Sequence, residues 1–320
     1  MSWLNKADFR AAVDAATRAP SMLNTQPWQF RLGDDQIDLL FDPRRRLPTV
    51  DASGWAARIG CGAALLNLRL ALAVQGKRAA VRLTPDRDGA PHLLARLTPQ
   101  PARPPTPTEL RLYHAIPNRH SNRGPFLDKP LPALARAKLI AAAREENARL
   151  DLLIGPIAVE AAALMVQSAH DLLARDAGYQ AELSAWIRRP ETATDGIPVF
   201  AGGPAPQPDE LLPRRDFGGP ELPIHRDYER DPLLAVLSVA GDWPADQIQA
   251  GQALQRVLLT ATDLGLGGSM FSQPIEVAAV REQLRRALGR QAPPQMLLRI
   301  GYAASAPPSP RRPAEEVIVS

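Results

Sequence analysis

The sequence predicts an α+β protein in which helices flank antiparallel or mixed sheets, and three observations lead to this fold class. Hydrophobic residues recur mostly with the 3.6-residue period of helices. Fewer segments have the alternating or continuous apolar pattern of strands. The two kinds of segment do not alternate regularly along the chain, which disfavours a doubly wound parallel sheet.

The expected elements follow from these periodicities and from the turn residues that bound them. Helices are expected at residues 6–18, 55–74, 108–114, 133–147, 157–186, 245–264 and 276–288. Strands are expected at 28–32, 36–41, 79–83, 93–98, 150–154, 233–241 and 295–302. The first two strands form a hairpin around Gly33, Asp34 and Asp35.

The composition is that of a globular protein and excludes several classes of function. The chain of 320 residues is 45% hydrophobic with a formal net charge of +4, so it is neither disordered nor a dedicated nucleic-acid binder. Its single cysteine, Cys61, cannot form an intrachain disulfide, and no metal-ligand spacing is present. The start lacks the pattern of a signal peptide, and Asn67 and Arg69 interrupt the longest apolar run. We therefore expect a cytoplasmic protein without metal, nucleic-acid or membrane partners.

Proline marks the expected divisions of the chain, which has 33 of these residues. A cluster at 99–107 predicts a linker, because it fits neither a helix nor an inner strand. The linker separates a half at 1–107 from a half at 108–320. A second Pro/Gly-rich stretch, 190–232, contains Arg214-Arg215-Asp216-Phe217. An irregular segment of this length predicts either a functional lid or disorder.

The longest expected helices of the two halves share a faint repeat. Five residues of the first helix recur in the second at a constant offset in the sequence. The matched pairs are Gly62 with Gly251, Ala64 with Ala253, Leu65 with Leu254, Leu70 with Leu259 and Gly76 with Gly265. Two buried Ala/Leu helices can look alike by chance, and a duplicated unit gives the same pattern. The repeat alone leaves both interpretations open.

Two polar motifs are candidates for ligand binding. In the first, Pro20-Ser21-Met22-Leu23-Asn24-Thr25-Gln26-Pro27-Trp28, the prolines and serine fit an ordinary turn, but two amides beside an indole also suit the imide-like edge of a flavin. In the second, Arg119 and Arg123 flank Ser121. Two guanidinium groups at this spacing form a phosphate clamp, although an Arg-x-x-x-Arg pair also arises by chance in an arginine-rich chain.

Two further stretches lie near the C-terminus. The run Leu264-Gly265-Leu266-Gly267-Gly268-Ser269-Met270-Phe271-Ser272-Gln273 lacks the third glycine of a dinucleotide fingerprint and follows a helix. It is either a glycine cap with a turn or a segment whose backbone amides face a flat ligand. The last stretch holds Arg311 and Arg312, which by themselves predict only an exposed basic tail.

Together these four stretches resemble the flavin-dependent nitroreductase family, and in particular its Acg-type branch. Each subunit of a dimeric member carries an Arg-x-Ser-x-Arg motif, a Pro-Ser-x-x-Asn-x-Gln-Pro-Trp motif, a Leu-Gly-Leu segment and a basic tail. Here the half at 1–107 keeps only the second of these, and the half at 108–320 keeps the other three. The resemblance therefore implies two fused nitroreductase-like halves, a pseudo-dimer with one complete flavin site.

The resemblance also implies a cofactor and the residues that bind it. The cofactor is FMN, with NAD(P)H as the electron donor and a small molecule as the acceptor. Its phosphate would be bound by Arg119, Ser121, Arg123 and either Arg311 or Arg312, and its ring by Ser21, Asn24, Phe271, Ser272 and Gln273. No side chain is expected to act as a catalytic acid or base, because the cofactor itself carries the hydride chemistry.

Three functions compete at this stage. The first is reduction of nitro compounds or quinones by NAD(P)H through FMN. The second is sequestration of FMN under stress, with the 190–232 segment covering the flavin and little reductase activity. The third is a binding module that uses its basic tail to hold an anionic partner. Fusion of the halves makes a monomeric pseudo-dimer the expected state, and further dimerisation stays open.

Overall fold

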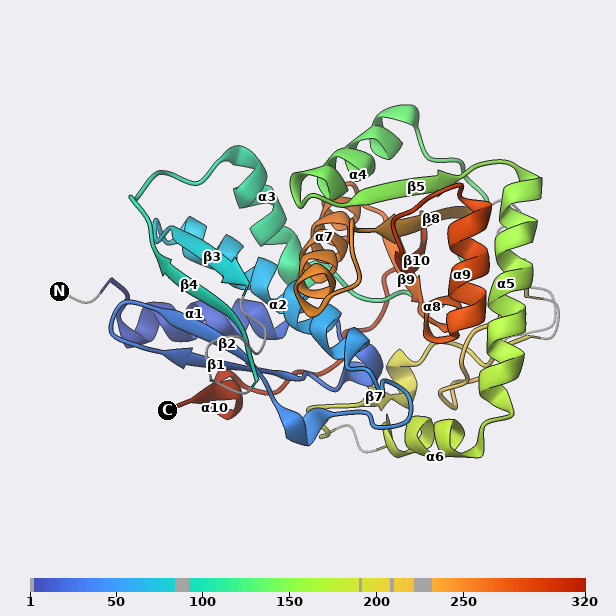
Figure 1. Ribbon diagram of the computed structural model, residues 1–320, viewed down its shortest axis with the longest axis horizontal. Coiled ribbons are helices and arrows are strands. Elements are labelled where there is room, and N and C mark those ends of the chain that lie inside the picture. The colour runs from blue at the N-terminus through green and yellow to red at the C-terminus, as the bar shows by residue number, and fades with distance from the viewer. Residues whose placement is uncertain (1–2, 84–91, 190–191, 208–209, 222–231) are drawn as a thin grey trace.

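The computed structural model describes residues 3–83, 92–189, 192–207, 210–221 and 232–320. Parts of the 190–232 segment therefore lie outside the described residues. In the described chain, two sheets lie on either side of a central pair of helices (Figure 1). The central helices are α2 (Trp55–Val74) and α7 (Pro244–Asp263). Helices flank mixed and antiparallel sheets, so the predicted α+β class is confirmed.

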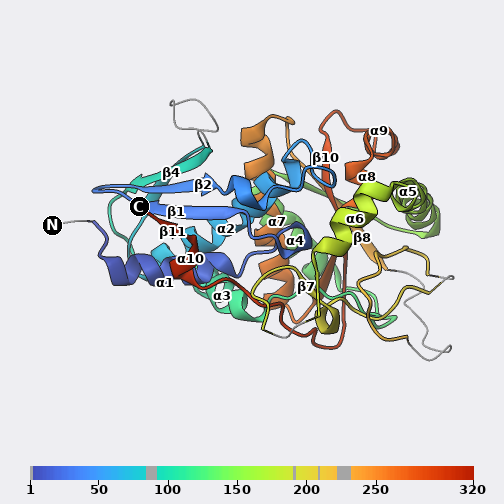
Figure 2. The same ribbon diagram turned by 90° about the horizontal axis from the view of Figure 1, so that it is seen from below.

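The first sheet combines the start of the chain with its end. Its strands run in the order β11-β1-β2-β4-β3. They are β1 (Trp28–Leu32), β2 (Ile37–Phe41), β3 (Ala79–Leu83), β4 (Leu93–Pro99) and β11 (Ile318–Val319). All neighbours are antiparallel except β11, which pairs with β1 in parallel. The C-terminus therefore lies at this sheet, and the first helix, α1 (Lys6–Thr17), lies beside it (Figure 2).

The second sheet is antiparallel throughout, in the order β5-β8-β10-β9. Its strands are β5 (Arg149–Leu153), β8 (Leu233–Ser238), β9 (Gly267–Phe271) and β10 (Pro294–Gly301). A two-stranded parallel ladder joins β6 (Ile187–Arg188) to β7 (Ile197–Pro198).

Within the described residues, eight further α-helices surround the central pair, and side chains of Asn5, Thr106 and Asp176 cap three of them. They are α1 (Lys6–Thr17), α3 (Pro107–Ala115), α4 (Ala133–Glu145), α5 (Pro156–Ala174), α6 (Ala177–Ala185), α8 (Gln273–Glu276), α9 (Ala278–Ala287) and α10 (Ala314–Val317). A capping box of Thr106 and Glu109 opens α3, immediately after the proline cluster that predicts a linker. Helix α3 then packs against both α2 and α7.

The central helices cross at the two glycines that align in the repeat. A Cβ atom on Gly62 would lie 3.0 Å from the Cα of Gly251 and would collide with the carbonyl oxygen of Ile248. A Cβ atom on Gly251 would lie 2.9 Å from the Cα of Gly62 and would collide with the carbonyl oxygen of Ile59. The contact is reciprocal, with the same three-residue spacing in both directions. Only glycine permits so close an approach of two helix backbones.

Three expected elements differ in the structure. The single helix expected at 157–186 is two helices, because Asp176 accepts a hydrogen bond from the backbone N–H of Tyr179 and so caps a new helix, α6. The helix expected at 276–288 begins at Ala278 as α9, because Glu276 ends the short helix α8 and the backbone of Val277 is extended. The glycine-rich run, expected to be either a glycine cap with a turn or a segment that faces a flat ligand, contains strand β9, and its pairing with β10 supplies the order that its glycines do not favour.

The C-terminal stretch is also not the exposed basic tail that its composition suggests. Ala314 and Val317 are buried in the core of the first sheet, and the guanidinium group of Arg312 is almost fully covered. The hypothesis of an exposed basic tail that holds an anionic partner is therefore not supported by the packing of residues 312–317.

The helices α2 and α5 are each long and apolar enough to cross a membrane by length and composition alone. Within the protein, 78% of the apolar window of α2 is buried, against 28% for α5. The burial of α2 is that of a core helix, whose apolar residues pack against the rest of the protein. Cys61 lies on this helix, and complete burial raises the pKa of its thiol, so it serves as a small core residue.

Candidate functional site

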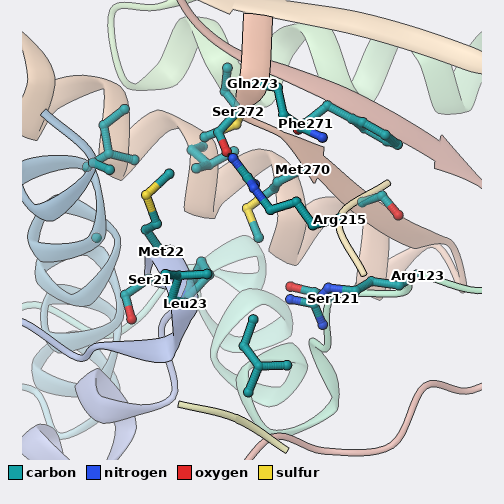
Figure 3. Close-up of a pocket in the computed structure, with 18 of the residues that line it drawn as sticks. Ser21, Met22, Leu23, Ser121, Arg123, Arg215, Met270, Phe271, Ser272 and Gln273 are labelled. Carbon is teal, nitrogen blue, oxygen red and sulfur yellow. The ribbon is translucent and has the colours of Figure 1, made fainter. Parts of the chain in front are cut away.

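A cavity of about 880 Å³, including the solvent at its mouth, lies beside the N-terminal end of α2 (Figure 3). Its walls come from the turn at 20–23, the start of α2, the β9–α8 junction and the 190–232 segment. Its lining is largely apolar and includes Trp55, Phe217, Phe271, Met22, Met270 and Met296. Three arginines line it as well, Arg123, Arg214 and Arg215, and among the described residues no carboxylate does. Such a cavity suits a flat, partly apolar ligand that carries negative charge.

The turn at 21–26 positions Ser21 in this cavity through an unusual backbone. Leu23, Asn24 and Gln26 have φ angles of 49°, 54° and 53°, a region that non-glycine residues rarely adopt. The Ser21 hydroxyl accepts a 2.9 Å hydrogen bond from the backbone N–H of Gln26, which closes the turn. Strained backbone of this kind is concentrated at functional sites, where the surrounding contacts hold it in place.

The two amides of this turn bind other chain segments. The Asn24 side chain donates to the carbonyl oxygens of Gly196, at 2.9 Å, and Pro310, at 3.1 Å. Gln26 donates to the carbonyl oxygen of Thr194 and accepts from the backbone N–H of Arg312. Ser21 lines the cavity and Asn24 does not, although the buried Oδ1 of Asn24 has no hydrogen-bond partner in the described structure.

Three of the predicted arginines are buried cations without a carboxylate partner among the described residues. Burial, followed by the charges of nearby arginines, lowers the pKa of Arg119 to about 10 and that of Arg123 to about 10. Burial, followed by the charges of Arg119 and Arg18, lowers the pKa of Arg311 to about 9. The Nε atoms of Arg119 and Arg311 are buried without a partner. Such charges are costly unless an anion compensates them.

Arg119 and Arg311 lie together, whereas Arg123 reaches the cavity. Both Arg119 and Arg311 donate to the carbonyl oxygen of Arg18, at 3.3 and 3.5 Å, and Arg311 also donates to that of Ala19. Arg123 and Ser121 line the cavity. Arg123 Nη1 donates a hydrogen bond of 2.9 Å to the carbonyl oxygen of Ala201.

The other tail arginine is engaged elsewhere. Arg312 is ion-paired with Glu316 at 3.2 Å and lies 3.9 Å from a carboxylate oxygen of Asp42. It also donates to the backbone carbonyl oxygen of Glu316. The structure thus separates two neighbouring arginines that the sequence could not distinguish.

The β9–α8 junction brings Phe271, Ser272 and Gln273 to the opposite wall of the cavity. The ladder between β9 and β10 fixes this strand, and the Ser269 hydroxyl donates to the carbonyl oxygen of Asn122. The junction is therefore joined directly to the loop that holds Ser121 and Arg123.

Comparisons with known proteins identify the family. A sequence profile described as the nitroreductase family matches residues 219–302. "Putative NAD(P)H nitroreductase acg" of Mycobacterium tuberculosis is 32% identical over 97% of this chain and 94% of its own length. The chain belongs to the nitroreductase family. The predicted resemblance is thereby confirmed.

Two further relatives extend this result. "Putative NAD(P)H nitroreductase Rv3131" of the same organism is also 32% identical, over 97% of this chain and 90% of its own length. A solved structure named as a putative nitroreductase from Anabaena variabilis covers 94% of this chain and 74% of its own, with a TM-score of 0.50 and 11% identity. The last likeness concerns the fold alone.

The residues that sequence reasoning left without a role come mostly from the 190–232 segment of this nitroreductase family member. Arg214, Arg215, Phe217 and Ile197 line the cavity. Arg215 is ion-paired with Glu276 at 2.5 Å, and the guanidinium of Arg123 lies 5.1 Å from the ring centroid of Phe217. The Arg-Arg-Asp-Phe run is visible in the sequence, but nothing in it indicates that both arginines and the phenylalanine line the cavity.

Proposed function

We propose that this protein binds FMN in the cavity and is an NAD(P)H-dependent oxidoreductase that reduces nitro compounds or quinones by two electrons. The observation that carries the proposal is the group of three buried arginines, Arg119, Arg123 and Arg311, that lack carboxylate partners among the described residues. The family assignment supports it, as do the relatives named as NAD(P)H nitroreductases.

The residues present fit this cofactor. A phosphate would compensate the three arginines and would give the orphaned Nε atoms of Arg119 and Arg311 an acceptor. Ser21 and the run from Phe271 to Gln273 lie on different walls of the cavity, where each could contact one part of the flavin ring. When bound, FMN supplies hydride transfer, while the chain orients it and surrounds it with apolar groups.

We also propose that the chain is a monomeric pseudo-dimer, with nitroreductase-like halves at 1–107 and 108–320. The reciprocal crossing of α2 and α7 at Gly62 and Gly251 supports this proposal, because a two-fold-related pair of helices makes the same contact twice. The C-terminal strand β11 nevertheless belongs to the sheet of the first half.

A second candidate function, sequestration of FMN, is favoured by the contacts of the 190–232 segment, referred to below as the cover segment. In its described part, backbone carbonyls accept hydrogen bonds from residues of all three cavity motifs: Asn24, Gln26, Arg123 and Gln273. Asp195 anchors the cover segment further through ion pairs with Arg45 and Arg188. A segment held by so many contacts would limit access of a nicotinamide donor to the cavity.

An anaerobic absorption spectrum of the FMN-loaded protein, recorded before and after addition of NADPH, distinguishes these functions. Flavin bands that bleach within seconds would establish a reductase. Bands that persist until dithionite is added would establish a shielded cofactor and favour sequestration. A protein that retains no added FMN would contradict both functions.

The role of the cover segment can be tested with Asp195→Asn, which weakens its two ion pairs. If the cover segment excludes the donor, this variant is expected to be reduced by NADPH faster than the original protein. Asp216→Asn is the matched control, since among the described residues the Asp216 carboxylate accepts a hydrogen bond from the local N–H of Gly218 and has no ion pair. Equal reduction rates in all three proteins would argue against exclusion.

A further inference from the structure

We infer that Arg215, carried by the cover segment, is a further residue of the cofactor site: the cation that stabilises negative charge on the reduced flavin. This inference rests on the proposed function, and it adds a residue that neither the four sequence motifs nor the comparisons indicate. It also gives the cover segment an electrostatic role, in addition to covering the cavity.

The geometry around Arg215 fixes its charge at the cavity wall. Its Nη2 is ion-paired with Glu276 at 2.5 Å, its Nε donates to the hydroxyl of Tyr179 at 2.8 Å, and its Nη1 donates to the hydroxyl of Ser272 at 3.1 Å. Tyr179 in turn donates to Glu276 at 2.9 Å. A side chain held at each of its nitrogens has little freedom to move.

Of this ion pair, the guanidinium faces the cavity and the carboxylate lies behind it. Arg215 lines the cavity, whereas Glu276 and Tyr179 do not. Figure 3 shows the Arg215 side chain directed toward Ser272, inside the cavity. The Glu276 side chain is only 4% exposed. The pair is neutral as a whole, but its positive end is closer to any bound ligand.

Arg215 also retains N–H groups for a ligand. Its three contacts with described residues use one hydrogen at each nitrogen, and a guanidinium has further hydrogens on Nη1 and Nη2. Burial by itself would lower the pKa of Arg215, but Glu276 and Tyr179 raise it above its ordinary value. The group therefore remains a cation throughout the physiological range.

In the proposed function Ser272 contacts the flavin ring, so Arg215, which donates to the Ser272 hydroxyl, would lie beside the same edge of the ring. Two-electron reduction of a flavin leaves negative charge on its pyrimidine ring when the ring is not protonated. A fixed cation in a cavity shielded from water stabilises that charge without any rearrangement. Because Arg215 belongs to the cover segment, this stabilisation is present only while the segment is docked.

Addition of sulfite to the oxidised flavin tests the inference without turnover. The sulfur lone pair of sulfite would form a bond to N5 of the ring, and π electrons of the ring's C=N bonds would shift to its pyrimidine portion, which takes the negative charge. No further reductant or oxidant takes part. A cation at this edge therefore strengthens sulfite binding. The dissociation constant is measured from the loss of the flavin absorption band.

Substitutions of the ion pair are expected to act in opposite directions. Arg215→Met should weaken sulfite binding about tenfold, and Glu276→Gln should strengthen it several-fold, because the cation then loses its counter-charge. Arg215→Lys should retain most of the affinity. The reduction potential should follow the same order, with about 30 mV for each tenfold change in a two-electron equilibrium. Arg286→Met, which removes an exposed arginine on α9, is the control for net charge.

The outcomes separate this inference from the function on which it rests. A protein that binds no FMN refutes the proposed function. A protein that binds FMN, but whose sulfite affinity changes less than twofold in Arg215→Met and Glu276→Gln, overturns the role of Arg215 alone. If Arg215→Met does not fold or does not retain FMN, Glu276→Gln and Arg215→Lys decide the question.

Discussion

Two groups of arginines with half-buried or buried side chains differ in their carboxylate partners. Arg69 and Arg256, from the two central helices, share the buried Glu146 at 2.8 and 2.6 Å. Arg119 and Arg311 are buried to a similar or greater degree, and the described residues give them only carbonyl oxygens. The difference indicates where a ligand is needed. The chain itself supplies the counter-charge of the first group, whereas the second group requires an anion from outside.

Removing the internal carboxylate should have the largest effect. In Glu146→Gln, the half-buried Arg69 and Arg256 both lose the buried carboxylate that pairs with them, and the free energy of unfolding should fall by about 3–5 kcal/mol. Denaturant unfolding of the flavin-free protein measures the change. If stability is unaffected, the two groups of arginines do not differ in the way described.

Removing Arg123, which lines the cavity, together with the buried Arg119 should weaken ligand binding without lowering stability. In the double variant Arg119→Met, Arg123→Met, FMN affinity should fall about hundredfold, because two charge-assisted contacts to the phosphate are lost. The flavin-free protein should be as stable as before or more stable, since it no longer buries uncompensated charges. Flavin titration and unfolding curves test both statements. Retention of FMN with unchanged affinity would contradict the phosphate clamp.

The tail offers a matched pair of neighbouring arginines. Arg311→Met should weaken FMN binding about tenfold and leave the stability of the flavin-free protein nearly unchanged. Arg312→Met should leave FMN affinity within twofold but lower stability by about 1–2 kcal/mol, because it breaks the contacts with Glu316 and Asp42. Equal effects of the two substitutions on flavin binding would show that the tail does not divide its roles in this way.

Inorganic phosphate should give the smallest effect. At a concentration ten times its dissociation constant, it should stabilise the flavin-free protein by about 1.4 kcal/mol through binding at the arginines. Thermal unfolding in phosphate and in chloride of equal ionic strength measures this stabilisation. The double variant at 119 and 123 should not respond. A response of the same size in that variant would mean that phosphate acts elsewhere.

The sequence was sufficient for most of the fold and for the family. The 3.6-residue period predicts the two central helices, and the repeat aligns Gly62 with Gly251, but the crossing of the helices at these glycines is visible only in the structure. The sequence could not predict strand β9, because its glycines have low strand propensity and its order comes from the ladder with β10. The pairing partners of β9 are the residues of β10, which lie about 30 positions later in the sequence.

The sequence motifs indicate which residue types form the candidate site, but they do not indicate which side chains point into the cavity and which bind other parts of the chain. Arg311 and Arg312 are chemically identical, and only the positions of Asp42 and Glu316 in the folded chain distinguish them. Asn24 was assigned to the flavin ring, yet its amide donates to Gly196 and Pro310, which no local pattern indicates. That Arg215 faces the cavity depends in the same way on Glu276, which is 61 residues away in the chain.

The pairing of β11 with β1 has a consequence for how the protein is made. Gln26 accepts a hydrogen bond from the backbone of Arg312, and Ile318 pairs with Phe30, so the first and last parts of the chain are joined beside the cavity. A ribosome releases the N-terminal motif long before the C-terminal strand exists. Until the segment that holds Arg312 and β11 has been made and has joined the first sheet, the proposed site is unfinished, and FMN would not be captured in full.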